Sequence, residues 1–120
     1  MSFNTVYAEL KCPFCQASVN SGIGFKVGAL ENRRYKIGDC LNWDGKTCRP
    51  RTQPPDGNIR TIGYFNCDNP DCASWSDCYP QVQNALVVID NNRIIEVSVY
   101  NDALSGEMFE ILEPSKIHKP

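Results

Sequence analysis

Two pairs of closely spaced cysteines are the residues of this chain whose types and spacing indicate chemistry. Cys12 and Cys15 enclose two residues in CPFC, and Cys67 and Cys72 enclose four in CDNPDC. Two such pairs, separated by β structure, are typical of a tetrahedral four-thiolate site, because each short turn directs two sulfurs toward one point. We therefore expect Cys12, Cys15, Cys67 and Cys72 to hold one metal ion.

Zinc is the metal that this set favours. Four soft thiolates in a tetrahedral array suit zinc, although iron binds the same arrangement. Pro13 and Pro70 preset the backbone of the two turns, whose N–H groups remain free to donate to the thiolates. Two features leave another ligand set open: Gln16 and Ala17 stand where such a turn usually has a glycine, and 51 residues separate the pairs.

The other candidates for ligands are Cys40, Cys48, Cys78 and His118. Cys78 is close enough in sequence to Cys72 to replace it. The alternative for the three cysteines is a small buried hydrophobic side chain without a ligand role, the usual state of a free cysteine. His118 lies in the terminal residues, where we expect it to be exposed to solvent.

A redox use of CPFC, as in glutaredoxin-like active sites, is the weakest interpretation of the motif. That chemistry needs a strand before the motif and a helix directly after it, whose N-terminus lowers the pKa of the first thiol. The residues that follow, QASVNSGIG, include valine, asparagine, serine and two glycines and form a poor helix. We expect no redox centre here.

The elements that must position the cysteines are mostly β-strands. Apolar residues alternate with glycine or polar residues over 23–27 and 35–37, which predicts two strands that pair as a hairpin. A third strand is predicted in residues 58–67. Residues 85–100 have the pattern of a hairpin that turns at Asp90-Asn91-Asn92-Arg93, since Asn and Asp tolerate the left-handed conformations of tight turns.

Only the C-terminal segment has a helical pattern. Leu104, Met108, Ile111 and Leu112 fall on one helical face, with Asp102 as a possible N-cap. Gly106 weakens the pattern, so an edge strand over 108–112 is the alternative. We expect residues 113–120 to fray and the proline-rich residues 47–58 to form an exposed loop.

Length and composition predict one domain over residues 1–120, with a core from about residue 6 to 112. The expected fold is mainly β: a small zinc-ribbon-like antiparallel structure with at most one short C-terminal helix. The chain has no basic start with an apolar run of signal-peptide length and no apolar stretch that could span a bilayer. We therefore expect a cytoplasmic protein, whose thiols stay reduced and available to metal.

The formal charge of −2 conceals an asymmetry along the chain. Residues 1–60 carry nine Lys or Arg against five Asp or Glu, whereas residues 61–120 carry three against nine. An acidic face can attract a basic partner, although folding can also interleave the two halves and cancel the field. The acidic residues that we expect to form a partner-binding surface are Asp90, Glu96, Asp102, Glu107, Glu110 and Glu113.

The order of these motifs resembles a family of small bacterial zinc-ribbon proteins of mostly uncharacterised role. CPFC is followed by FKVG, YKIGD with LNW, GYFNC, and the acidic hairpin VVIDNNRIIEV, so the resemblance covers residues 6–97. It implies the zinc-ribbon fold and the metal. Some similar small acidic proteins serve as immunity proteins against secreted polymorphic or contact-dependent toxins. The longer second cysteine pair and the three extra cysteines depart from the family pattern.

An enzyme is not expected, because the single histidine lies in the tail and a closed four-cysteine site leaves no position for substrate. We expect a non-enzymatic protein-binding module, an immunity protein that binds and inhibits a cognate bacterial toxin with a basic cleft. The alternative is a nucleic-acid-binding zinc ribbon, although a pI near 5.3 speaks against it. Its candidate residues are Arg33, Arg34, Arg49, Arg51 and Arg60 for phosphates and Trp43, Tyr64 and Phe65 for stacking.

Overall fold

The structure, a computed structural model, describes residues 2–100 and 109–111 of the chain, and every regular element in this part is a β-strand. The mainly β prediction is confirmed. None of the described residues belongs to a helix that could cross a membrane. The strands are β1 (Asn4–Tyr7), β2 (Ile23–Phe25), β3 (Gly28–Ala29), β4 (Arg34–Lys36), β5 (Cys48–Arg49), β6 (Ile59–Phe65), β7 (Trp75–Ser76), β8 (Tyr79–Pro80), β9 (Gln83–Asp90), β10 (Arg93–Val99) and β11 (Phe109–Ile111).

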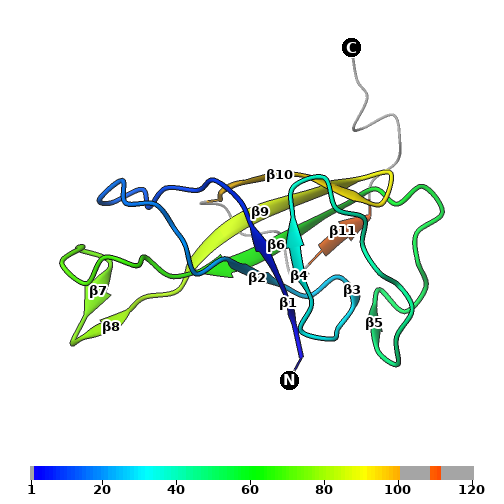
Figure 1. Ribbon diagram of the computed structural model, residues 1–120, viewed down its shortest axis with the longest axis horizontal. Coiled ribbons are helices and arrows are strands. Elements are labelled where there is room, and N and C mark those ends of the chain that lie inside the picture. Colours follow the sequence, from blue (N-terminus) through cyan, green and yellow to red (C-terminus); the bar gives the residue numbers. More distant parts are fainter. Residues whose placement is uncertain (1, 101–108, 112–120) are drawn as a thin grey trace, which may run out of the picture.

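One curled sheet of seven strands forms most of the molecule (Figure 1). Its strand order is β10-β9-β6-β2-β1-β4, and β11 also pairs with β6. The pairs are antiparallel except β1 and β4, which are parallel. Two small two-stranded sheets, β3 with β5 and β7 with β8, stand at opposite ends of it in Figure 1.

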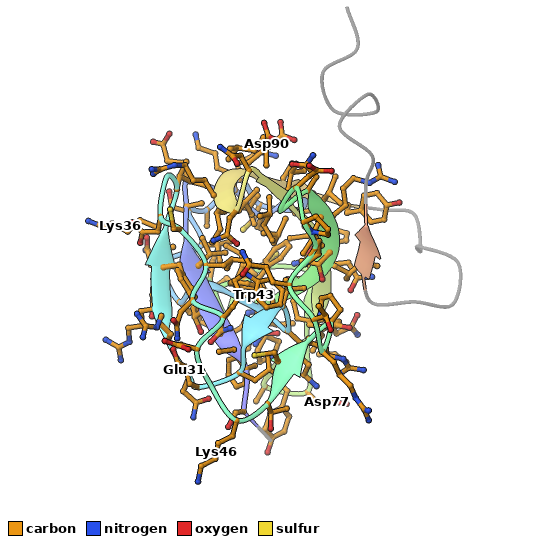
Figure 2. The ribbon with its side chains drawn as sticks, turned by 90° about the vertical axis from the view of Figure 1, so that its right-hand side faces the viewer. Glu31, Lys36, Trp43, Lys46, Asp77 and Asp90 are labelled. Carbon is orange, nitrogen blue, oxygen red and sulfur yellow. The ribbon has the colours of Figure 1, made fainter. Side chains whose placement is uncertain are left out.

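The sheet curls until its two edges meet. The segment that follows β4 hydrogen-bonds to the start of β10: the amide of Gly38 donates to the carbonyl of Ile94 (2.7 Å), and the amide of Ile94 donates to the carbonyl of Asp39 (3.0 Å). The amide of Leu41 continues this contact by donating to Asn92 (2.9 Å). Seen from its end, the sheet surrounds a core filled with side chains (Figure 2).

The expected hairpin between residues 23–27 and 35–37 is wrong. β2 and β4 do not pair with each other, because β1 lies between them and pairs with both. The chain leaves the sheet after β2: Gly28 has a φ of +84°, and β3 pairs with β5 instead. The vacant position is filled by the N-terminal strand, whose Asn4 and Val6 are fully buried.

The hairpin of residues 85–100 is confirmed as β9 and β10, and the strand of residues 58–67 as β6. Asn91 and Asn92 form the turn with φ of 51° and 65°, the left-handed values that asparagine tolerates. Ile59, Thr61 and Phe65 of β6 are buried. The core cluster comprises Val6, Leu10, Val19, Ile23, Phe25, Val27, Tyr35, Leu41, Ile59, Phe65, Ala85, Val87, Ile89 and Ile94.

The C-terminal segment contains a strand where a helix was the first expectation. β11 runs antiparallel to residues 59–61 of β6, in agreement with the edge-strand alternative. β2 pairs with β6 only at Tyr64, which leaves the edge of residues 59–61 available to β11. The predicted N-cap Asp102, the rest of the helical segment up to residue 108 and the tail 113–120 lie outside the described residues.

Candidate metal centre

Cys12, Cys15, Cys67 and Cys72 lie together at the end of the molecule that carries β7 and β8. Their four sulfurs all lie within 4.8 Å of one another. Cys12 Sγ is 3.7 Å from Cys72 Sγ, and Cys15 Sγ is 3.5 Å from Cys67 Sγ. A tetrahedral ion with metal–sulfur bonds of about 2.3 Å requires sulfurs about 3.8 Å apart. The donor set and its spacing therefore fit a metal ion bound by four thiolates.

The first cysteine loop, residues 10–19, is a narrow turn that holds Cys12 and Cys15. The amide of Cys12 donates to Ala17, and the amide of Gln16 donates to the carbonyl of Cys12, both at 2.9 Å. Gln16 has a φ of 63°, so the position does require the left-handed conformation that glycine adopts without strain. The loop is closed by the amide of Val19, which donates to Leu10 (2.9 Å).

The second cysteine loop, residues 66–75, presents Cys67 and Cys72 from the end of β6. The amide of Cys72 donates to Asn69 (3.0 Å), and the indole N–H of Trp75 donates to the carbonyl of Cys67 (2.9 Å). Asp68 Oδ2 accepts hydrogen bonds from the amides of Asn20 (2.6 Å) and Ser21 (3.2 Å). The carboxylate thereby fixes the second loop to the chain that leaves the first.

Donors within the second loop support its two sulfurs. The hydroxyl of Ser74 lies 3.2 Å from Cys72 Sγ and its amide 3.4 Å, and together they lower the pKa of that thiol. The amide of Asn69 lies 3.4 Å from Cys67 Sγ. Burial dominates at Cys67 and raises the pKa of its thiol to about 12. A metal ion would supply the positive charge that this buried thiolate needs.

Cys12 is also buried, but its surroundings favour the thiolate. Burial raises its pKa, and the backbone N–H groups of Phe14 and Cys15, together with the side chains of Gln83 and Cys67, outweigh this and lower the pKa to about 6. The side-chain amide of Gln83 adds a contact of 3.6 Å from β9. Sequence reasoning missed Gln83 and Ser74. Of the two, only Ser74 could have been identified from the sequence. It stands two residues after a cysteine, as Phe14 and Asn69 do, and the backbone amide of each of these residues supports the sulfur of that cysteine.

The cluster is closed to solvent. Cys12, Cys67 and Cys72 are buried, Cys15 is half-buried, and Trp75 packs against them. Four sulfurs around one point leave no open coordination position for water or substrate.

The three remaining cysteines lie away from the cluster. Cys78 is exposed at the tip of the β7–β8 hairpin, and Cys40 is exposed beside Arg93, so neither belongs to the cluster and neither is the buried side chain of the alternative. Cys48 is half-buried and its thiol contacts the carbonyl of Trp43 at 3.2 Å. All seven cysteines fall in the described part of the chain, and none forms a disulfide. His118 lies outside the described residues.

The expected acidic surface is only partly described. Asp90 is half-buried at the end of β9 (Figure 2), and Glu96 is exposed on β10. Glu110 lies in β11 opposite Arg60, while Asp102, Glu107 and Glu113 lie outside the described residues. Residues 2–100 carry ten basic and ten acidic side chains, so the excess negative charge of the chain belongs to residues 101–120.

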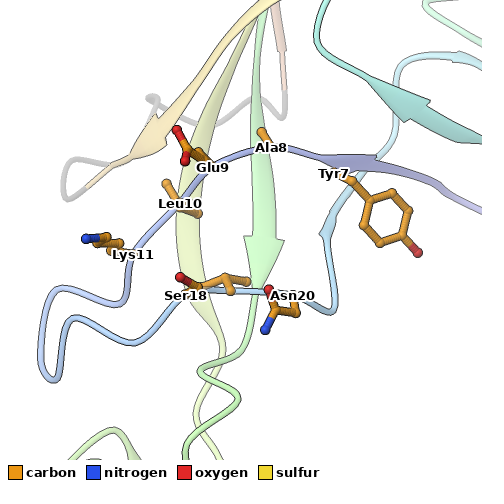
Figure 3. Close-up of a pocket in the computed structure, with 8 residues that line it drawn as sticks. Tyr7, Ala8, Glu9, Leu10, Lys11, Ser18 and Asn20 are labelled. Carbon is orange, nitrogen blue, oxygen red and sulfur yellow. The ribbon is translucent and has the colours of Figure 1, made fainter.

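A surface groove of about 810 Å³ lies at the stem of the first cysteine loop (Figure 3). Its lining includes one carboxylate and one ammonium, Glu9 and Lys11, whose ends point in different directions, and the ring of Tyr7 points away from both. The lining residues therefore offer no paired acid and base.

Comparison of the chain with known protein families, with curated proteins and with solved structures gives no match.

Proposed function

We propose that the chain is a non-enzymatic protein-binding module whose fold depends on one zinc ion held by Cys12, Cys15, Cys67 and Cys72. Four thiolates at tetrahedral spacing favour zinc among the common metals. The closed cluster supports a structural role, because a catalytic zinc keeps one position open. The metal would fix the two cysteine loops and the hairpin that follows them.

The observation that carries protein binding is the exposed apolar surface at the metal end. Phe14, between the first two cysteines, is 65% exposed, and Tyr79 on the adjoining hairpin is 74% exposed. Val82 is exposed as well. Exposed large apolar side chains on a rigid support are typical of interaction sites. We name Phe14, Tyr79 and Val82 the metal-end surface.

The partner that we propose is a bacterial toxin, which the chain binds and inhibits as an immunity protein in the cytoplasm. Support comes from the resemblance of residues 6–97 to zinc-ribbon proteins and from the acidic residues of the second half of the chain. An acidic inhibitor suits a nuclease toxin, whose substrate cleft is basic. Asp90, Glu96, Asp102, Glu107, Glu110 and Glu113 would steer the approach, and the metal-end surface would supply the buried contact.

The test is affinity capture of the tagged, zinc-loaded chain from its own cells, followed by mass spectrometry. We expect a stoichiometric small basic protein that is toxic when expressed alone and harmless when co-expressed with this chain. Phe14→Ser should lose the partner with an unchanged zinc content, whereas Ile37→Ser, at an exposed apolar position after β4, should retain it. Capture of RNA or ribosomal proteins in place of a basic protein would contradict the proposal.

The residues expected for the nucleic-acid alternative do not all lie on one exposed face. Phe65 is buried, and Trp43 is half-buried with its indole N–H on Asn92 Oδ1 (2.7 Å). Arg33 is paired with Glu31 (2.6 Å). Arg49 and Arg51 belong to β5 and the loop after it, apart from the main sheet that carries Arg34 and Arg60.

A further inference from the structure

The outer side of four neighbouring strands, β4, β1, β2 and β6, forms a continuous surface. Across these strands Thr5 is paired with Arg34 on one side and with Gly24 on the other, and Gly24 is paired in turn with Tyr64. Their neighbours along each strand, such as Val6 and Phe25, are buried in the core, so this row faces outward. We call this surface the outer sheet face.

Aromatic rings are exposed on the outer sheet face. Phe3, Tyr7 and Tyr64 are all more than a third exposed. Phe3, Gly24 and Tyr64 line a groove of about 540 Å³. A Cβ at Gly24 would lie 3.3 Å from the ring of Phe3 and 3.8 Å from the carbonyl oxygen of Tyr64, so a side chain there would crowd the ring of Phe3. The groove can therefore admit a flat group beside exposed rings.

Every charged side chain on the outward positions of these four strands is basic. Arg34 and Lys36 are exposed on β4, and Lys36 projects outward in Figure 2. Lys26 lines the groove, and Arg60 occupies an outward position on β6, where Glu110 of β11 is its cross-strand partner. Asp68, beside the groove, already accepts the amide of Ser21. The face thus joins local positive charge to exposed rings, although residues 2–100 as a whole are neutral.

We propose that the outer sheet face binds single-stranded nucleic acid. Bases stack on Tyr64 and Phe3 in the groove, and phosphates lie against Lys26, Arg34 and Lys36. Aromatic side chains on neighbouring strands with flanking cations are the combination by which β-sheets bind single strands, because every base has a face that can stack. A duplex is not bound in this way, since its bases are already stacked. Val82 of the metal-end surface also lines this groove, so the two surfaces adjoin, but Phe14 and Tyr79 do not line it and this binding does not rest on the proposed protein partner.

The experiment is fluorescence anisotropy of labelled oligonucleotides of mixed sequence, single-stranded RNA, single-stranded DNA and a duplex, titrated with the metal-loaded full chain. We expect the single strands to bind more tightly than the duplex, with affinity that falls as salt is raised. Tyr64→Ala should weaken binding at least about fivefold. Lys26→Gln should lower the slope of log K against log salt by about 0.7, because one phosphate fewer is neutralised by the protein.

Tyr79→Ala and Lys46→Gln are the matched controls, since both side chains are exposed but lie off the outer sheet face. They should leave the affinity for the single strands unchanged. The metal content and circular dichroism of all four variants should equal those of the wild type. The proposal is overturned if the single strands do not bind at low salt, or if Tyr79→Ala weakens binding as much as Tyr64→Ala. Loss of a captured protein partner in Tyr64→Ala, without any oligonucleotide binding, would overturn it in favour of a protein interface on this face.

Discussion

Single residues decide how well each clustered thiolate is supported. Cys72 receives the hydroxyl and the amide of Ser74, whereas the buried Cys67 has one amide contact and a pKa raised to about 12. Metal binding requires all four thiols to lose their protons, so the positive ion and these donors act together. Substitution of any one cysteine should therefore affect the whole site.

We expect serine at Cys12, Cys15, Cys67 or Cys72 to release the metal and to lower the free energy of unfolding by several kcal/mol. Structural zinc sites contribute apparent binding free energies of about 10–16 kcal/mol that are coupled to folding. Elemental analysis and urea unfolding measure both effects. Cys78→Ser, in an exposed cysteine outside the cluster, is the control and should retain the metal. Release of the metal by Cys78→Ser, and not by Cys72→Ser, would show that Cys72 is not a ligand.

Gln16 holds a backbone conformation that a side chain disfavours, with a φ of 63°. We expect Gln16→Gly to raise the free energy of unfolding by about 0.5–1 kcal/mol, because relief of the left-handed strain exceeds the added entropy of glycine in the unfolded chain. Thermal unfolding of the metal-loaded protein measures the difference. Gln16→Val, whose β-branched side chain tolerates positive φ poorly, should be destabilising; a stabilising effect of Val would refute this explanation.

At the scale of elements, the turn between β9 and β10 fastens the loops that close the sheet. Asn92 accepts the indole N–H of Trp43 (2.7 Å), and its side-chain amide donates to Leu41 (3.1 Å). Its backbone amide donates to Gly57 (3.0 Å), which is buried and would place a Cβ only 2.5 Å from that nitrogen. The hairpin turn is therefore an internal anchor for two loops that are distant in sequence.

Asn92→Gly tests this anchor, because glycine keeps the positive φ and removes only the side chain. We expect the free energy of unfolding to fall by about 1–3 kcal/mol, since the indole N–H of Trp43 and the carbonyl of Leu41 would have no partner. Fluorescence of the tryptophans during urea unfolding follows the change. Asn91→Gly shares the positive φ but changes an exposed side chain, so it should stay within about 0.5 kcal/mol of the wild type. Equal effects of the two substitutions would rule out the anchor.

In the molecule as a whole, two separate clusters of buried side chains stabilise the fold. The apolar core lies inside the curled sheet, and the cysteine cluster with Trp75 lies outside it at the metal end. Asp68 links the cysteine cluster to the sheet through its hydrogen bonds to the amides of Asn20 and Ser21. Gln83 links them from β9 through the contact of its side-chain amide with Cys12 Sγ. The metal end can therefore unfold locally while the sheet stays folded.

Chelation of the metal should therefore have an uneven effect on hydrogen exchange. We expect the amides of Gln16, Cys72 and Trp75, which close the two cysteine loops, to lose most of their protection. Amides in the β6–β9 ladder should retain much of theirs, because the buried apolar side chains of these strands remain. Exchange measured by mass spectrometry with and without chelator shows the pattern. A uniform loss of protection would show that the sheet cannot fold without the metal.

The sequence by itself determined the local features of this protein. The patterns of residues 58–67 and 85–100 indicate strands because alternating side chains must separate core from solvent, and two adjacent asparagines favour a tight turn within the second range. The close spacing of each cysteine pair likewise determines that both of its sulfurs lie on one turn. That the two turns meet is a matter of tertiary structure, because β6 pairs with β2 and Asp68 fixes the second loop to Asn20 and Ser21.

Only the tertiary structure decided the long-range arrangement. Local alternation does not state which strand pairs with which, so the insertion of β1 between β2 and β4 and the parallel β1–β4 pair depend on which apolar side chains fill the core together. The same limit applies to surfaces: Phe65 and Tyr64 are neighbours in sequence, but the register of β6 buries one and exposes the other. Four strands that align side by side bring Phe3, Tyr64, Lys26 and Arg34 onto one face. The spacing of these residues along the chain does not predict that alignment.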